Sequence, residues 1–477
     1  MSNRGNFSGR LGFILAAAGS AVGLGNIWRF PYLAGANGGA IFLVVYLICI
    51  VLLCYPVMVG EIAIGRAANR DAYGSYSKLG SKRWGYLGTF GILAGVFILS
   101  FYNVVAGWAF GYFLHISFGD LLNHTDFGGF FGAYVNDIID VGSMTGLANS
   151  NLIFSLLFMV FTAVIVSQGI QKGIEAANKI MMPSLYLILL GIIAYSMTLP
   201  NAMSGVKFYL VPDFSELHIG TVVNGLKQAF FSLSLGMGCL ITYGSYLSKN
   251  ENIPSSAIVI STADTSVAFF SGLMVFPLVH FLAFKLNIDP AAIGTQGPPL
   301  IFVVLPQIFS EMGPTLGRLV GGAFFLLVCF AALTSTISLL EVPVAYLVDQ
   351  KKLNRRRVVW GMAMLIFLLG LPSMMSQGMV NWLNKLTFYR GQDFLTFVSD
   401  MCDISLTVGG GLMCVFISRQ WGLANMDTEL ANGMEGYMTS RIRSYLHFTI
   451  RWVAPVLLGV LSVVIIIEKF FGVSNLI

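Results

Sequence analysis

A hydrophobic segment long enough to cross a bilayer is interrupted near the start of the chain by three glycines, an asparagine and an arginine. The interrupted region runs from Gly19 to Pro31 and reads GSAVGLGNIWRFP. Lipid offers no hydrogen-bonding partners, so unwound backbone at membrane depth survives only where protein buries it or where it lines a polar cavity. Because freed carbonyl groups are natural ligands for ions, this break predicts a binding site inside the membrane.

The composition is that of an integral membrane protein, with 56% hydrophobic residues, 10% charged residues and a mean hydropathy of +0.79. A helical span needs about 20 apolar residues. Eleven segments meet that requirement, near 11–33, 39–64, 86–115, 151–168, 177–199, 221–247, 256–285, 317–348, 357–374, 394–418 and 446–470. The first segment lacks the small-residue cleavage site of a secretory signal, so we expect it to be retained.

The distribution of positive charge predicts a cytoplasmic N-terminus. Most Lys and Arg residues, including Arg66, Arg70 and the run 355–357, fall on one side of the predicted spans. The loop at 116–150, on the other side, has four Asp residues and no Lys or Arg. The positive-inside rule therefore places the N-terminus in the cytoplasm, and an odd number of spans places the C-terminus outside. The net charge of +5 reflects this topology and does not indicate a nucleic-acid partner.

A second interrupted segment, 231–238 with the sequence FSLSLGMG, falls five spans after the first. Gly-interrupted segments at corresponding positions of two halves indicate an inverted repeat with a transport site between the halves. The alternative is that these glycines serve close helix packing. We expect a cytoplasmic segment at 1–10, five-helix repeats at 11–199 and 200–418, and a last cytoplasmic loop with the eleventh helix at 419–477. The loop part of this last region, about 419–445, has no clear role and could contain a short surface helix.

The run from Arg10 to Pro31, followed by Asn37-Gly-Gly, resembles the first-helix signature of the neurotransmitter:sodium symporter family. The resemblance continues through 173–183, 228–238, 297–302 and 331–336, and it covers nearly the whole chain. It implies an all-α membrane protein with a LeuT-type fold, a five-plus-five inverted repeat with broken first and sixth helices, and an eleventh helix. It also implies sodium-coupled import by alternating access in the bacterial inner membrane.

The resemblance implies two sodium sites, built from the hard oxygen ligands that such cations prefer. The first would use the Ala21 carbonyl, Asn26, Ser232, Asp264 and the carboxylate of the substrate. The second would use the Gly19, Val22 and Ala331 carbonyls with Thr334 and Ser335. Without the resemblance, these last two hydroxyls could instead bond back to their own helix.

Asp264 departs from the animal members of the family, which have Asn there and bind chloride nearby. Tyr46, Gln228 and Ser232 match the chloride-site pattern, but Ala268 supplies no hydroxyl. Acids within the membrane are costly and usually functional. We therefore expect the fixed negative charge of Asp264 to take the place of the anion, so that transport requires no chloride. A structural hydrogen-bond acceptor is the alternative. Proton antiport through Asp264 is a further hypothesis.

The resemblance also supplies a substrate pocket with an apolar side-chain end. Its residues are Ser20, Ala21, Leu24, Gly25, Ile98, Tyr102, Phe231, Ser232, Ser234, Met237, Ser335 and Leu339. Monoamine carriers have an aspartate where this chain has Gly23, so an amino acid that brings its own carboxylate is the better candidate. We expect hydrophobic or aromatic L-amino acids.

Gates are expected on both sides of the pocket. Arg29, Gln228 and Asp403 match the outer gate, with Tyr102 and Phe231 as the lid, and Arg4, Ser245, Tyr246 and Asp349 match the inner gate. Arg4 and Asp349 could instead be ordinary juxtamembrane charges. Glu61 is expected to support the unwound backbone. Glu341 could be solvated in the inner vestibule, and no role is assigned to it.

The alternative functions are those of a channel, an enzyme and a distant sodium transporter. A channel could use the same broken helices as a filter. An enzyme is not expected, because the chain has no nucleophile, metal-ligand or phosphate-binding pattern. A distant sodium transporter sharing only the architecture is the nearest rival. The sequence leaves open which amino acid is carried, the sodium stoichiometry, proton counter-transport and whether the protein is a monomer or a weak homodimer.

Overall fold

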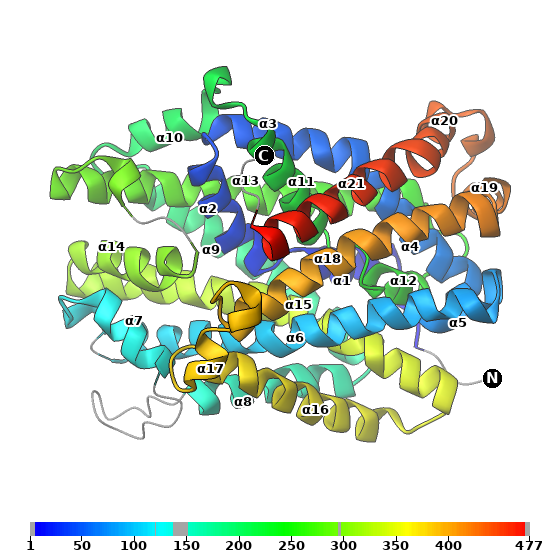
Figure 1. Cartoon of the computed structure of the whole chain (residues 1–477), viewed down its shortest axis with the longest axis horizontal. Helices are drawn as coiled ribbons and strands as arrows, with labels where there is room; N and C mark the ends of the chain where they lie inside the picture. The colour runs from blue at the N-terminus through cyan, green and yellow to red at the C-terminus, as the bar shows by residue number, and fades with distance from the viewer. Residues whose placement is uncertain (1–4, 120, 137–150, 294–296, 473–477) are drawn as a thin grey trace.

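The computed structural model describes residues 5–119, 121–136, 151–293 and 297–472, and these residues form helices and loops with one isolated bridge between Leu386 and Gln392. Figure 1 shows the long helices lying side by side. The predicted Arg4, Asp120, Asp137 and Asp140 lie outside the described residues.

The first half of the chain contains the first interrupted helix and the long helix α6. In order, its elements are α1 (Arg10–Ala21), η1 (Gly25–Arg29), α2 (Phe30–Ala36), α3 (Ala40–Cys49), η2 (Ile50–Cys54), α4 (Tyr55–Ala68), α5 (Ala72–Leu79), α6 (Lys82–Ser117), η3 (Leu121–Asn123), α7 (Phe127–Asn136), α8 (Asn151–Ser167), η4 (Ile170–Glu175) and α9 (Ala176–Ser196).

The second half contains the second interrupted helix and the long helices α13 and α15. In order, its elements are α10 (Ala202–Leu210), η5 (Phe214–Glu216), α11 (Ile219–Ser232), α12 (Cys239–Gly244), α13 (Ile253–Leu286), η6 (Pro290–Ala292), η7 (Leu300–Val304), α14 (Leu305–Glu311), α15 (Pro314–Lys351), α16 (Arg355–Met375), α17 (Asn381–Asn384), η8 (Thr387–Tyr389), α18 (Phe394–Val415), η9 (Phe416–Trp421), α19 (Leu423–Ala431), η10 (Tyr437–Thr439), α20 (Arg441–Phe448), η11 (Thr449–Val453), α21 (Ala454–Ile466) and η12 (Ile467–Phe471).

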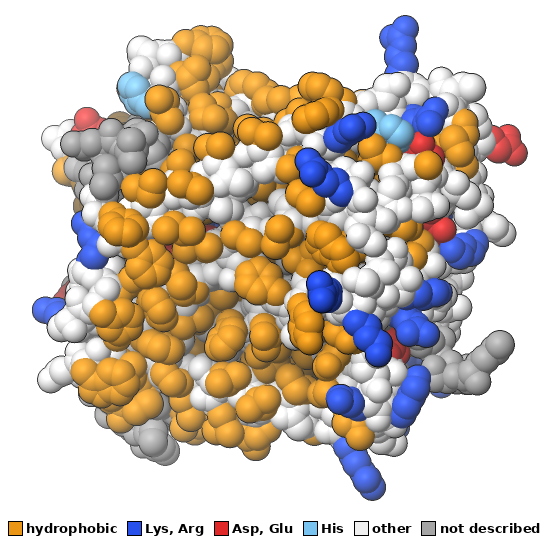
Figure 2. Space-filling model, turned by 45° about the vertical axis from the view of Figure 1, so that its right-hand side comes forward, with side chains coloured by type: hydrophobic (Ala, Val, Ile, Leu, Met, Phe, Trp, Pro, Cys, Tyr) orange, Lys and Arg blue, Asp and Glu red, His pale blue; other side chains and the backbone are white. Residues whose placement is uncertain are grey.

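Each of the eleven predicted hydrophobic segments is helical. In the part of the chain that the structure describes, eight helices are long and apolar enough to cross a membrane, and the bent pair α1 and η1–α2 makes a ninth span. The two remaining segments are α8, which has 17 residues, and the segment divided between α11 and α12. Their membrane crossing stays a prediction. Figure 2 shows a broad apolar face bordered on one side by Lys and Arg, as expected for a protein in a bilayer.

Both interruptions occur where the sequence places small residues. The first helix ends at Ala21, and the chain bends by 51° before the helix resumes at Gly25. In the sixth segment Gly236 and Gly238 have φ of +83° and +78°, values that side chains rarely adopt. A Cβ on Gly236 would also lie 2.4 Å from the carbonyl oxygen of Leu406. The second break therefore requires Gly236 for both conformation and space, and Gly238 for its conformation.

The segment at 419–445 is not a plain surface loop. It contains α19, whose Met426, Asp427, Glu429 and Leu430 are buried. The short helix is therefore present, with one face buried and Ala424, Asn425 and Thr428 exposed on the other.

Candidate substrate and ion site

The two breaks meet in the interior of the protein. The Ser234 hydroxyl, in the second break, donates to the carbonyl oxygen of Ser20 over 2.9 Å. The backbone N–H of Leu24, in the first break, donates to the Tyr102 hydroxyl over 2.8 Å. Each contact satisfies a backbone group that a continuous helix would have paired within itself.

Two buried polar side chains support the same region. Glu61 of α4 accepts a hydrogen bond from the backbone N–H of Gly236 over 2.6 Å. Gln228 of α11 donates to the carbonyl oxygen of Gly25 over 2.8 Å. Glu61 thus occupies the supporting position that the sequence suggested for it.

Asp264 of α13 is the centre of a fully buried polar cluster. Its carboxylate accepts from Asn26 Nδ2 at 2.7 Å, from Ser232 Oγ at 2.9 and 3.0 Å, and from the Tyr46 hydroxyl at 3.2 Å. Asn26 Oδ1 in turn accepts from the backbone N–H of Gly23. The side chains predicted for the first sodium site therefore converge, and their carboxylate, amide and hydroxyl oxygens are the hard donors that sodium requires.

The side chains predicted for the second sodium site also lie against the first break. Thr334 Oγ1 lies 3.2 Å from the carbonyl oxygen of Val22 and 3.0 Å from that of Ala331. Ser335 Oγ lies 3.3 Å from the Val22 oxygen and 3.5 Å from that of Ser20. Hydroxyls of α15 thus face the carbonyls of Ser20 and Val22 at the end of α1, and an ion could take the place of these hydrogen bonds.

Asn178 of α9 is a neighbour of this region that the sequence analysis did not identify. It is fully buried, and its Oδ1 would lie 2.0 Å from a Cβ on Gly19. Only glycine fits at position 19 without displacing this amide. The available signal was its place in the run 173–183, at the start of the predicted segment 177–199.

A small cavity of about 30 Å³ lies between the two breaks. Its lining contains every predicted substrate residue except Ser20 and Leu24, and it adds Gly23. A Cβ on Gly23 would lie 2.5 Å from Ser335 Oγ and 2.7 Å from the Tyr102 hydroxyl. The space beside Gly23 is therefore occupied by two hydroxyls.

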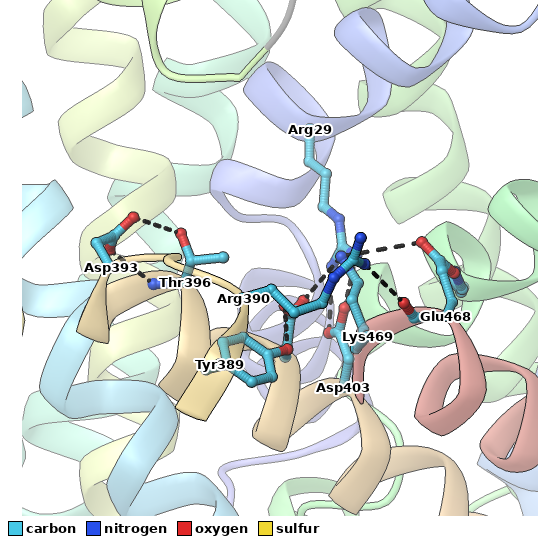
Figure 3. A network of polar contacts seen from close by, with 10 residues as sticks. Arg29, Tyr389, Arg390, Asp393, Thr396, Asp403, Glu468 and Lys469 are labelled. Carbon is cyan, nitrogen blue, oxygen red and sulfur yellow. Dashed lines mark hydrogen bonds and ion pairs between the residues drawn. The ribbon is translucent and has the colours of Figure 1, made fainter. Parts of the chain in front are cut away.

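The predicted outer gate is closed by an ion pair. Arg29 NH2 lies 2.7 Å from Asp403 Oδ2, and the guanidinium carbon lies 4.6 Å from the centre of the Phe231 ring. Figure 3 shows Arg29 reaching to Asp403. A cavity of about 420 Å³, called the outer cavity below, is lined by this pair and by Tyr102, Lys227 and Phe231 among others.

On the opposite side the structure describes only part of the predicted inner gate. Asp349 accepts from the backbone N–H of Asp71, and the Ser245 hydroxyl donates to the carbonyl oxygen of Thr242. The predicted partner Arg4 lies outside the described residues.

The expectation that Glu341 is solvated was wrong. Glu341 is fully buried, and its carboxylate accepts from the Tyr246 hydroxyl at 2.8 Å and from Arg355 at 2.5 and 3.0 Å. Two α-helices meet at the 351–355 turn, which brings Arg355 back onto Glu341. Tyr246 of the predicted inner gate therefore bonds to an acid that the sequence analysis had set aside.

Three further residues of the outer cavity were also missed. Lys227, Glu468 and Lys469 line it, yet the sequence showed them only as charges at the outer ends of apolar segments. The opposite charges of Glu468 and the two lysines were the only indication in the sequence that these side chains could pair.

The family model described as the sodium:neurotransmitter symporter family matches residues 4–127 and 123–472. The chain belongs to this family. Sequence relatives of this symporter include the uncharacterized sodium-dependent transporter YhdH of Bacillus subtilis, 35% identical over 90% of both chains. A second, from Haemophilus influenzae, is 34% identical over 85% of this chain and 88% of its own.

A solved structure supports the same conclusion. The symporter matches the crystal structure of MhsT in complex with L-phenylalanine with a TM-score of 0.84 and 40% identity, over 96% of this chain and 99% of MhsT. These findings confirm the LeuT-type fold and sodium-coupled transport, and they confirm that the protein is a transporter and not an enzyme. The roles of individual site residues stay predictions.

Proposed function

We propose that this symporter imports hydrophobic or aromatic L-amino acids with sodium and without chloride. The main observation is that a small cavity with apolar walls opens onto Ser232, which bonds directly to the buried carboxylate of Asp264. A substrate carboxylate at this position would complete the first sodium site and so couple the two solutes.

The cavity walls favour an apolar substrate side chain. Ile98, Phe231, Met237 and Leu339 line it, and the flexible thioether of Met237 adapts to large groups. The Tyr102 hydroxyl, which accepts from Leu24, keeps its own proton free for a substrate carboxylate. The L-phenylalanine bound to MhsT agrees with this assignment.

The environment of Asp264 supports transport without chloride. Its carboxylate already has the hydroxyls of Tyr46 and Ser232 as donors, and Ala268, one turn further along α13, is fully buried and has no hydroxyl to offer an anion. Uptake should be unchanged when gluconate replaces chloride. A steep loss of uptake in gluconate would contradict the proposal.

Proton antiport is part of the same proposal. Once sodium and substrate have left, the buried carboxylate of Asp264 has no cation beside it, and an unpaired charge in the membrane is costly. A proton taken up at Asp264 would remove that cost during the return step. Sodium-driven uptake into proteoliposomes should then depend on lumenal pH, whereas indifference to it would exclude this step.

We further propose the bacterial inner membrane as the location, with the N-terminus in the cytoplasm, two sodium sites, and a monomer or weak homodimer as the transporting unit. The border of Lys and Arg seen in Figure 2 supports an asymmetric orientation.

A thermal-shift screen against the common L-amino acids tests the substrate class. The purified protein is assayed in sodium and again in potassium. Stabilisation confined to sodium and to apolar or aromatic amino acids is expected. Stabilisation by polar amino acids alone, or equally in potassium, would contradict the assignment.

A further inference from the structure

The C-terminal end of the last span forms one wall of the outer cavity. Ile465, Glu468 and Lys469, from the end of α21 and from η12, line this cavity. The span is held in place by packing of α21 against α18, where the Ser462 hydroxyl donates to the Thr407 hydroxyl over 2.9 Å. Figure 3 shows Glu468 and Lys469 approaching the Arg29–Asp403 pair from this helix.

Glu468 makes an ion pair with the helix that carries the lid. Its Oε2 lies 2.5 Å from Lys227 Nζ, and the two side chains are 31% and 10% exposed. Lys227 lies on α11, four residues before Phe231, so both face the same side of the helix. The ion pair between Glu468 and Lys227 therefore holds α11 in place close to the lid residue Phe231.

The neighbouring residue pairs with the helix that carries the gate aspartate. Lys469 Nζ lies 3.2 Å from Asp400 Oδ1, three residues before Asp403 on α18. Asp400 Oδ2 also accepts from the Tyr389 hydroxyl over 2.7 Å. Burial and this hydrogen bond to Asp400 raise the pKa of Tyr389, so its phenol keeps its proton and remains a donor at neutral pH.

Consecutive residues of one span thus bind α11, which carries the lid residue Phe231, and α18, which carries the gate residue Asp403. We propose that Lys227 and Glu468 form a second outer gate pair, which holds α11 against the end of the last span when the outer cavity is closed. This inference rests on the proposed alternating-access function. It gives the C-terminal end of the eleventh helix a direct part in gating, which neither the family match nor the sequence assigns to it.

The pair should open and close with the cycle because its strength is modest. Partly exposed ion pairs contribute little, so losing one should shift the balance between closed and open outer cavities by about two- to fivefold. Breaking the pair should therefore favour the open cavity without unfolding the protein.

The experiment measures how fast a cysteine in the outer cavity is modified. Ser399 lines this cavity, and Ser399→Cys provides the reporter. A neutral methanethiosulfonate reagent avoids effects of the altered cavity charge, and the protein without the reporter gives the background of the six native cysteines. Rates are measured in proteoliposomes in sodium and in potassium for Lys227→Met, Glu468→Gln and the exchanged pair Lys227→Glu/Glu468→Lys.

A matched control uses an ion pair away from the cavity. Lys285 and Glu311 pair on α13 and α14, at partly exposed positions, and Lys285→Met and Glu311→Gln should leave the reporter rate unchanged. Of the two modification rates, in sodium and in potassium, the lower one reports the closed outer cavity. We expect either single change at 227 or 468 to raise this lower rate about two- to fivefold, and the exchanged pair to return it to the parent value. Restoration also shows that the single changes act through the pair between positions 227 and 468.

The second gate pair would be overturned if both single variants were modified at the same rate as the parent. It would also be overturned if the exchanged pair were modified as fast as the single variants. The proposed function fails separately. If the parent rate is the same in sodium and potassium, the outer cavity does not respond to sodium, whatever the variants do.

Discussion

Asn26 and Asp264 lie 238 residues apart in the chain, and Nδ2 of Asn26 donates to Oδ1 of Asp264 over 2.7 Å. This contact joins the break in the first helix directly to α13. Because both side chains are fully buried, the contact requires the break to be packed against α13 at this point. The polar cluster and the interrupted backbone are therefore parts of one structure.

Replacement of Asp264 by Asn should weaken sodium binding. The variant keeps the shape of the side chain, but it replaces one accepting oxygen with an NH2 donor and removes the negative charge that Asn26, Ser232 and Tyr46 surround. Interactions with a charged group contribute about 1.5–3 kcal/mol, so we expect about a 10- to 100-fold rise in the sodium concentration for half-maximal uptake.

The measurement is the sodium dependence of amino-acid uptake into proteoliposomes. Asp213→Asn, at an exposed loop position, is the matched control and should behave as the parent. An unchanged sodium requirement in the Asp264 variant would assign this carboxylate a structural role only.

Thr334→Val tests the second ion site. Valine preserves the volume but removes the hydroxyl that lies 3.2 Å from the Val22 carbonyl. We expect about a three- to tenfold higher sodium requirement, since a typical hydrogen-bonding oxygen contributes about 0.5–1.5 kcal/mol.

Thr336→Val is the control for this variant. Thr336 is also buried on α15, but its hydroxyl contacts Thr162 and its own helix, away from the first break. Equal effects of the two valines on the sodium requirement would mean that Thr334 is a packing hydroxyl.

The arrangement of helices could be predicted from the sequence, and the Arg29–Asp403 ion pair from the family resemblance, whereas the other ion pairs could not. Runs of apolar residues locate the spans, and the Gly and Ser residues at 19–25 and 232–238 locate the breaks, because both features depend on local composition. The convergence of Asn26 with Asp264 needed the family resemblance, since no spacing along the chain relates them.

Glu341 with Arg355 and Lys227 with Glu468 escaped prediction for another reason. A single charge at the end of an apolar segment is equally compatible with solvent and with a partner, and the choice depends on the positions of whole helices. Asn178 is similar, because only the packed structure shows that its amide lies against Gly19.

Arg66→Met should destabilise the protein at the end that the predicted topology places in the cytoplasm. Arg66 is fully buried at the end of α4, and its Nε lies 2.6 Å from Glu429 Oε1 on α19, while its other nitrogens donate to the carbonyl oxygens of Glu251 and Glu429. Removing one partner of a buried ion pair typically costs about 3–5 kcal/mol. We expect a Tm in detergent lowered by several degrees.

Two further variants interpret that result. Lys172→Met removes an exposed cation and should leave Tm unchanged. Arg66→Met/Glu429→Gln removes the unpaired carboxylate as well and should recover part of the loss. A double variant less stable than the single one would show that Lys249, which lies 2.9 Å from Glu429, already compensates that carboxylate.

Gly23→Ala should impair substrate binding while leaving the fold intact. The added Cβ would lie 2.5 Å from Ser335 Oγ and 2.7 Å from the Tyr102 hydroxyl, so both must move, and both line the substrate cavity. Overpacking of this kind costs about 1–3 kcal/mol, which predicts about a 5- to 150-fold loss of affinity for the best amino acid found in the screen. Gly191→Ala, on α9 with nothing within 4 Å of its added Cβ, is the control and should bind as the parent does. Parent-like affinity in Gly23→Ala, measured at saturating sodium, would mean that the substrate does not use the space between these two hydroxyls.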